Sequence, residues 1–195
     1  MFKNLIELTK VRIGFLVLTT TIIGFYLGAQ GKIDNMLLLF TVIGTLLSST
    51  GSSVMNNVIE SESDKLMDRT KNRVLPTKKI SLNFAKFLGI SFIIVGLLIL
   101  YFKVNFLTCM LSLLTIILYL FLYTPLKRES WLNTSVGAIP GAIPPLGGWT
   151  AATNSLEWGG IAVFLILFFG NTLIFIPSHI CIKKTIKMPV YKCCL

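Results

Sequence analysis

A regular series of oxygen-bearing side chains stands near the middle of the sequence. Its members follow one another at intervals of four residues: Asn56, Glu60, Asp64 and Asp68. On a helix this spacing places them along one face. Carboxylates stacked on one face repel each other, but a hard divalent cation favours such a row, and Mg²⁺ is often held by one or two carboxylates together with substrate phosphates. The series therefore predicts a Mg²⁺ site.

Basic side chains follow the acidic ones directly. Arg69, Lys71 and Arg73 come next in the chain. Arginine matches phosphate oxygens in a bidentate way, so acid followed by base favours a Mg²⁺–diphosphate site. A later polar segment contains Lys127 and Arg128, which could add positive charge to the same diphosphate. The alternative is a solvated loop whose basic residues only set the membrane topology, and the spacing alone leaves both open.

The chain around this segment has the composition of a membrane protein. Of its 195 residues, 54% are hydrophobic and 13% are charged, and the mean hydropathy is +0.79. A soluble domain carries roughly 25% charged residues, so the predicted fold class is an all-α, polytopic transmembrane bundle in the lipid bilayer. The net charge of +10 comes from residues between apolar segments, which favours a membrane over nucleic acid as the partner. The four cysteines lack the spacing of zinc sites.

Six apolar segments qualify as membrane spans, since a spanning helix needs about 20 mainly apolar residues. Sixteen of the 18 lysines and arginines lie on one predicted side of the membrane, and only Lys32 and Lys103 lie on the other. Because positive residues mark the cytoplasmic side, we expect a multi-pass protein whose N-terminus and charged loops are cytoplasmic. The predicted spans are residues 12–30, 36–55, 85–102, 104–123, 136–153 and 159–177.

The predicted fifth span has an unusual composition. Its stretch GAIPGAIPPLGGW contains Pro140, Pro144 and Pro145 among four glycines. Prolines kink helices, and the carbonyls that they free in lipid need partners from protein or a cavity. The G-x-x-x-G pattern of Gly137 and Gly141 alternatively forms a tight packing face. Both interpretations place a kinked helix inside the bundle.

Two long motifs contain the residues that could carry out chemistry. Asn56, Asn57, Glu60 and Asp64 match the pattern N-D-x-x-D-x-x-x-D, with Asn and Glu at its second and third places. DKLMDRTKNRVL then matches D-x-x-M-x-R-T-K-N-R-x-L, and YTPLKR precedes NTSVGAIPGAIPPLGGW. In these motifs the chain resembles the UbiA superfamily of intramembrane prenyltransferases, and within it the haem O synthase branch. The resemblance covers roughly residues 5–169.

The resemblance implies a helical bundle of nine spans around a cavity open to a membrane, which would be a bacterial inner membrane. It implies transfer of a farnesyl group from farnesyl diphosphate to a vinyl group of haem B, giving haem O for terminal oxidases. Asn56, Glu60 and Asp64 would be the catalytic set that holds Mg²⁺ on the diphosphate, and Asp68 would be a bystander. The implied diphosphate-binding residues are Arg69, Lys71, Arg73, Lys127 and Arg128.

The last part of the chain departs from the family pattern. No Asp or Glu follows Glu157, so the family's second acidic motif is missing. We therefore expect a transmembrane prenyltransferase domain at 1–169 and an atypical tail at 170–195, for which a shift of reading frame near codon 170 is our hypothesis. The gene sequence decides it, because a one-base change should restore a family-like W-Q-x-P-H-F segment. A genuine tail predicts little or no activity.

Three other functions stay open. Another UbiA-type enzyme, one that prenylates an aromatic ring, would share the first motif. An inactive fragment would lack the second acidic motif. A carrier would place charged residues within its spans, where this sequence has almost none.

Overall fold

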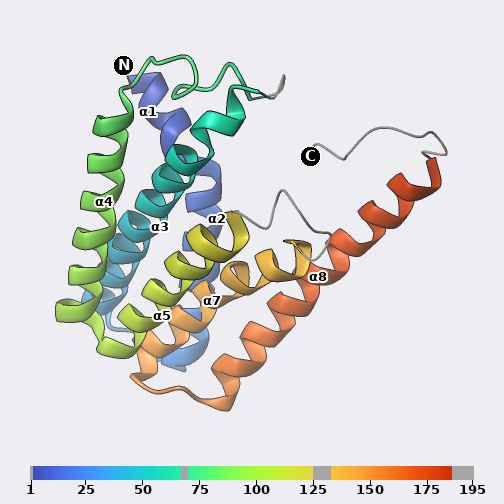
Figure 1. The fold of residues 1–195 in the computed structure, drawn as a ribbon. Helices are drawn as coiled ribbons and strands as arrows, with labels where there is room; N and C mark the ends of the chain where they lie inside the picture. The colour runs from blue at the N-terminus through green and yellow to red at the C-terminus, as the bar shows by residue number, and fades with distance from the viewer. Residues whose placement is uncertain (1, 67–69, 125–132, 186–195) are drawn as a thin grey trace.

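The chain folds into a bundle of helices. The computed structural model describes residues 2–66, 70–124 and 133–185, of which 2–3, 133–135 and 173–185 are described by their backbone only. Every regular element in these ranges is a helix, which confirms the all-α prediction. In Figure 1, α2 to α7 lie together while the C-terminal half of α8 extends away from them. The elements are α1 (Phe2–Thr9), α2 (Val11–Ala29), α3 (Asn35–Asp64), α4 (Leu82–Ile99), the π-helix η1 (Leu100–Val104), α5 (Phe106–Ile117), the π-helix η2 (Leu118–Tyr123), α7 (Asn133–Thr153) and α8 (Trp158–Thr185).

The predicted membrane spans all fall on helices, but their number has only rough support. Among the described residues, α7 does not meet the length and hydropathy of a membrane-crossing helix, and α8 contributes a shorter apolar stretch, Trp158–Thr172. In the part of the chain that the structure describes, four helices are long and apolar enough to cross a membrane: Val11–Ala29, Asn35–Asp64, Leu82–Val104 and Phe106–Tyr123.

Helix α3 continues beyond the predicted membrane span. The predicted span ends at residue 55, but the helix continues to Asp64. It begins after Asp34, whose carboxylate accepts hydrogen bonds from the N–H groups of Met36 and Leu37. Its 30 residues at a rise of 1.5 Å each give a length of about 45 Å, against a hydrocarbon thickness of about 30 Å. The last turns of α3 therefore extend beyond the membrane core.

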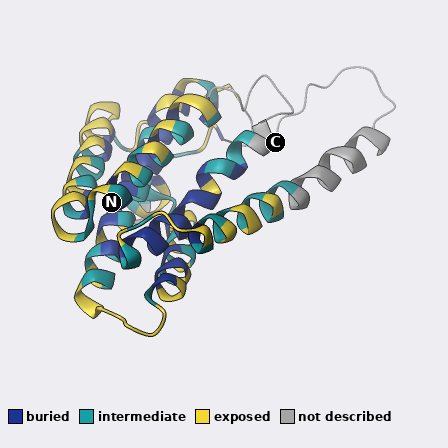
Figure 2. Cartoon of the chain, turned by 90° about the horizontal axis from the view of Figure 1, so that it is seen from below, coloured by how far each residue is buried: buried dark blue, intermediate teal, exposed yellow. Residues whose placement is uncertain are grey.

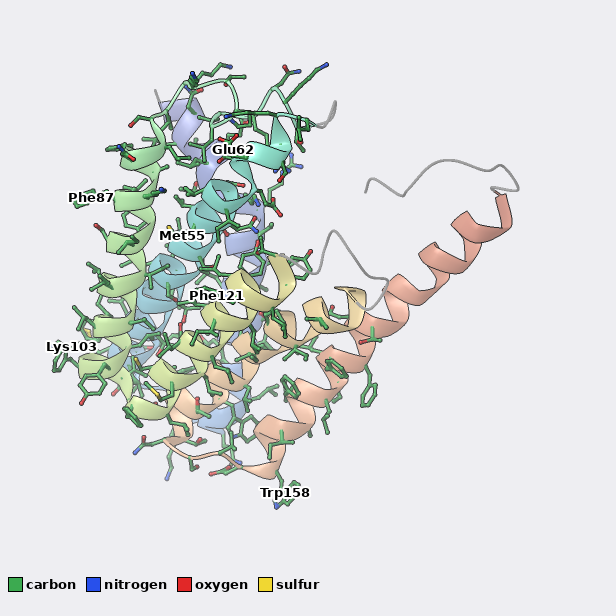
Figure 3. All side chains as sticks on the ribbon, in the orientation of Figure 1. Met55, Glu62, Phe87, Lys103, Phe121 and Trp158 are labelled. Carbon is green, nitrogen blue, oxygen red and sulfur yellow. The ribbon has the colours of Figure 1, made fainter. Side chains whose placement is uncertain are left out.

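The two ends of the bundle differ in character. Glu62, near the end of α3, lies at the same end as α1 and the segment that joins α3 to α4 (Figures 1 and 3). Lys103 and Trp158 lie at the opposite end (Figure 3). The short connections after η1 and before α8 thus share one end, as the alternation of predicted spans requires.

Helices α3 and α4 approach each other closely because glycines face each other between them. Each helix has two glycines seven residues apart, Gly44 and Gly51 on α3 and Gly89 and Gly96 on α4. A Cβ atom on Gly51 would lie 2.7 Å from the Gly89 carbonyl oxygen, and one on Gly96 would lie 2.8 Å from the Gly44 carbonyl oxygen. Small residues of this kind let membrane helices pack backbone to backbone. This packing holds α3, which carries the oxygen series.

Helix α7 lies in the interior of the bundle, as its composition predicts. Figure 2 shows it dark blue along most of its length, and its three prolines lie inside one continuous helix. Side chains at the start of α5 donate hydrogen bonds to its carbonyl groups. Asn105 Nδ2 lies 2.7 Å from the Thr150 oxygen, and Thr108 Oγ1 lies 3.4 Å from the Gly147 oxygen. Two carbonyl groups of this proline-containing helix thus accept hydrogen bonds from within the protein.

We expect Gly51→Ala to lower the free energy of unfolding by about 1–3 kcal/mol, because a new methyl group there overpacks a backbone contact. Gly147→Ala is the matched control, since a Cβ atom at that helical position meets nothing within 4 Å. Thermal unfolding in detergent, followed by circular dichroism, compares the two variants with the wild type. Equal midpoints for both variants would contradict the close approach of α3 and α4.

Candidate functional site

The end of α3 carries the oxygen series on a buried face. Asn56, Glu60 and Asp64 are 2%, 7% and 5% exposed. They stand on successive turns of one helix, and α3 ends at Asp64. A solvated helix would turn its carboxylates toward water, so this burial argues against a plain solvated loop. Asp68 lies outside the described residues.

Arg73 reaches back to the two carboxylates from the segment after α3. Its Nη1 atom lies 2.8 Å from Asp64 Oδ2 and 3.6 Å from Glu60 Oε2. The Arg73 side chain is 33% exposed, whereas both carboxylates are nearly enclosed. One guanidinium group therefore compensates two buried like charges that would otherwise repel each other.

Local contacts turn the segment back so that Arg73 arrives at this position. Thr70 Oγ1 donates to the Asp64 carbonyl oxygen at 3.2 Å, and the Arg73 N–H donates to the Thr70 carbonyl oxygen at 3.0 Å. Val74 and Leu75, directly after Arg73, are buried and anchor the segment. Leu75 belongs to an apolar cluster that also contains Leu8, Val54, Val58 and Ala85.

Three separate elements meet at Asn56. Its Oδ1 atom accepts a hydrogen bond from Lys10 Nζ at 2.8 Å, and its Nδ2 donates to Thr124 Oγ1 at 2.9 Å. Lys10 joins α1 to α2 with a left-handed backbone, φ 48°, which residues other than glycine rarely adopt. Such a strained position is typical of functional sites. Thr124 follows η2, so α3 is linked here to both the first and the fourth long apolar helix.

Asn57 links α3 to α1 and borders a cavity. Its Nδ2 atom donates to the Leu8 carbonyl oxygen at 2.8 Å. Its Oδ1 atom is buried without a hydrogen-bond partner in the described part of the chain. The adjacent cavity has a volume of about 170 Å³, which is enough for a few water molecules. Its polar lining consists of Glu7, Lys10, Asn57, Asp64 and Arg73.

Two aromatic rings lie near Glu60. Tyr119 and Tyr123 in η2 stack with their ring centroids 5.5 Å apart and their planes at 13°. Both interact electrostatically with Glu60. Gly137 on α7 leaves room for Tyr123, because a Cβ atom there would lie 2.7 Å from the ring. The predicted small-residue face of α7 thus borders the site.

The predicted diphosphate-binding residues are described only in part. Arg69, Lys127 and Arg128 lie outside the described residues, and Lys71 is exposed on the segment that contains Arg73. Arg73, one of these five, contacts both carboxylates directly.

The sequence-based prediction assigned no role at the site to two residues that touch Asn56. Lys10 counted only toward the membrane topology, and Thr124 had no role. Lys10 and Asn56 are 46 residues apart, so no local spacing could reveal their contact. Thr124 carried one signal, its place in YTP beside the second motif.

The donor atoms of this face fit a hard divalent cation. Glu60 and Asp64 offer carboxylate oxygens, and Asn56 offers its amide oxygen Oδ1, which accepts from Lys10. In the part of the chain that the structure describes, no three or more His, Cys, Asp or Glu side chains gather as a complete metal cage would require. Mg²⁺ suits this incomplete set, because it is typically held by one or two carboxylates while phosphates and water supply the rest.

We expect Arg73→Gln to lower the free energy of unfolding by about 3 kcal/mol, because it leaves two buried carboxylates uncompensated. Millimolar Mg²⁺ should restore part of that loss by supplying positive charge at the same place. Lys65→Gln is the control, since its partner Glu62 is 79% exposed and such surface pairs contribute about 1 kcal/mol or less. Unfolding midpoints with and without Mg²⁺ test this. The account is wrong if Mg²⁺ leaves the Arg73→Gln midpoint unchanged.

Known bacterial proteins are similar in sequence. A Solibacter usitatus protein named protoheme IX farnesyltransferase is 40% identical over 175 residues, which cover 85% of this chain and 60% of the relative. A protein of the same name from Leptospira biflexa is 39% identical over 180 residues, which cover 92% of this chain and 62% of the relative. The chain therefore spans about three fifths of the length of these relatives.

Solved structures share the fold. A chain from a study of digeranylgeranylglyceryl phosphate synthase in membranes superposes with a TM-score of 0.78 at 22% identity, covering 88% of this chain and 60% of that one. A UbiA homologue from Archaeoglobus fulgidus, bound to DMAPP and Mg²⁺, superposes with a TM-score of 0.70 at 19% identity, covering 90% and 62%. The model of the UbiA prenyltransferase family matches residues 17–184. Because this match takes in most of the sequence, the chain belongs to the UbiA prenyltransferase family.

Proposed function

We propose that the oxygen face of α3 and Arg73 form a Mg²⁺–diphosphate site for transfer of a farnesyl group from farnesyl diphosphate to a vinyl group of haem B, giving haem O. The observation that carries this proposal is the buried pair Glu60 and Asp64 with the Arg73 guanidinium 2.8 Å from Asp64. The choice of haem B rests on relatives at about 40% identity that are named protoheme IX farnesyltransferase.

Each group has a stated task in this proposal. Asn56, Glu60 and Asp64 would hold Mg²⁺ through their oxygen atoms. Arg73 exchanges its carboxylate partners for diphosphate oxygens, which a guanidinium matches in a bidentate way. Its partial exposure leaves it accessible to such a ligand. Further diphosphate contacts would come from Arg69, Lys71, Lys127 and Arg128.

The reaction requires a stabilised leaving group and a dry place for a carbocation. When bound, Mg²⁺ supplies charge neutralisation for the diphosphate as the allylic C–O bond breaks. Arg73 donates to the same oxygens from a position that the protein has already fixed. Tyr119 and Tyr123 offer an aromatic wall that attracts the farnesyl cation and shields it from water. The haem vinyl carbon attacks this cation, and water then adds as a hydroxyl while a proton leaves.

The site also needs a suitable place in the membrane. The apolar helices and the family identify the chain as an integral membrane protein. We place it in a bacterial inner membrane with its N-terminus and charged segments on the cytoplasmic side, where 16 of its 18 basic residues fall. The oxygen face of α3 lies at that end, so a diphosphate can reach it from water while its farnesyl chain lies among apolar helices.

Binding tests the metal–diphosphate part of the proposal. The chain should bind farnesyl diphosphate in the presence of Mg²⁺, and EDTA should abolish binding. Asp64→Asn should weaken it about ten- to a hundredfold, because a charged interaction worth about 1.5–3 kcal/mol is lost. Glu62→Gln is the matched control, since Glu62 lies on the same helix but is 79% exposed. Equal affinity of wild type and Asp64→Asn for farnesyl diphosphate in an equilibrium binding assay would refute the metal–diphosphate part of the proposal.

Product analysis tests the acceptor. Haem B and an aromatic quinone precursor are offered together with Mg²⁺ and farnesyl diphosphate, to the chain itself and to its form with the reading frame restored after residue 169. The frame-restored form should yield a haem whose mass has increased by one farnesyl group plus one hydroxyl group. Mass spectrometry of the extracted pigments detects it. A prenylated aromatic compound with unchanged haem B would show that the acceptor is wrong.

A further inference from the structure

Thr124 is a buried hydroxyl side chain, 2% exposed, between the end of η2 and the oxygen face of α3. Its Oγ1 atom lies 2.8 Å from the Tyr119 carbonyl oxygen and 2.9 Å from the Asn56 amide nitrogen Nδ2. A carbonyl oxygen can only accept, and a threonine hydroxyl has one proton. That proton is therefore used on Tyr119, and Oγ1 can only accept from Asn56.

This count of protons determines which way the Asn56 amide points. An amide side chain can present either its oxygen or its nitrogen to a given neighbour, and the hydrogen-bond network decides between them. Thr124 accepts from Asn56, so the amide nitrogen faces η2, and the amide oxygen Oδ1 faces Lys10, which lines the cavity together with Asp64 and Arg73. Lys10 requires the same orientation independently, because its ammonium group only donates and lies 2.8 Å from Oδ1.

The π-helical turn gives Thr124 this role. Elsewhere in the chain, helical threonines such as Thr19 and Thr115 donate to the carbonyl group four residues before them. Thr124 donates to the carbonyl group five residues before it, and its own backbone N–H donates to that same oxygen. In this wider turn the hydroxyl proton is donated to the Tyr119 carbonyl oxygen, so the lone pairs of Oγ1 can accept from Asn56 on α3. Single π-turns of this kind occur frequently at functional sites.

The hydrogen bond from Lys10 would not hold the Asn56 amide in this orientation once a metal ion is bound. A cation at Asn56 Oδ1 and the Lys10 ammonium would compete for one oxygen and repel each other. The contact with Thr124 uses the nitrogen Nδ2 of the amide, so it does not compete with a cation at Oδ1.

We propose that Thr124 is a positioning residue that holds the Asn56 amide with its oxygen toward the divalent cation. This inference rests on the proposed function, because it concerns the Mg²⁺ site of that reaction. Groups that orient a metal ligand in this way typically change metal affinity about 10–100-fold when they are removed.

The experiment measures Mn²⁺ in place of Mg²⁺ by electron paramagnetic resonance, on the full chain with farnesyl diphosphate present. Thr124→Val keeps the shape and the backbone N–H bond to Tyr119 but leaves the Asn56 amide free to turn. It should weaken Mn²⁺ binding about tenfold or more. Thr124→Ser should bind within about twofold of the wild type, because it keeps the hydroxyl. Thr21→Val is the matched control, a buried threonine whose hydroxyl donates within its own helix.

Two further variants separate a positioning role from a structural one. In an Asn56→Ala background, adding Thr124→Val should cause no further loss of Mn²⁺ affinity, because Thr124 acts through Asn56. Unfolding midpoints are measured for every variant, and Thr124→Ala replaces the valine variant if that one does not fold.

If the wild type binds Mn²⁺ and Thr124→Val binds it equally well, this inference is wrong while the proposed function stands. The same holds if Thr124→Ser binds Mn²⁺ as weakly as Thr124→Val. Additive losses in the double variant would overturn it too. A wild-type chain that binds no Mn²⁺ with farnesyl diphosphate would overturn the proposed function and this inference with it.

Discussion

Two carboxylates one turn apart on a buried helix face need positive charge close by, and this need organises the charged end of the molecule. Glu60 and Asp64 obtain that charge from Arg73, whose guanidinium bridges them. The segment after α3 must therefore fold back, and the burial of Val74 and Leu75 holds it there. In the proposed function, a partly exposed arginine lets such a site accept a metal ion and a diphosphate without leaving charge uncompensated in either state.

The positions of these groups depend on the way the helices pack. Glycines on α3 and α4 let the two backbones meet, so α3 is held along its apolar part while its charged end extends beyond it. Helix α7 packs against α2 through further small residues, where Gly24 and Gly148 face backbone atoms of the other helix. Gly137 on α7 makes room for the Tyr123 ring beside the site. The small residues of the apolar bundle thus position the polar site.

Much of this arrangement could be predicted from the sequence, because it depends on local spacing. The interval of four placed Asn56, Glu60 and Asp64 on one helical face, and composition predicted an all-helical membrane bundle with α7 inside it. The predicted membrane span ended at residue 55, where hydropathy fell, and the helix runs on through the polar residues of the oxygen series. The contacts of Asn56 with Lys10 and Thr124 join residues 46 and 68 positions apart, so only the folded chain brings them together.

The central claim is that the oxygen face of α3 binds a cation, and that the Arg73 guanidinium compensates the carboxylates while no cation is bound. A structure of the chain with Mg²⁺ and an unreactive thio analogue of farnesyl diphosphate tests it most directly. The account predicts density for a metal ion beside Glu60 and Asp64, with the Arg73 guanidinium moved from Asp64 to the diphosphate. A diphosphate bound elsewhere, with Arg73 still 2.8 Å from Asp64, would contradict it.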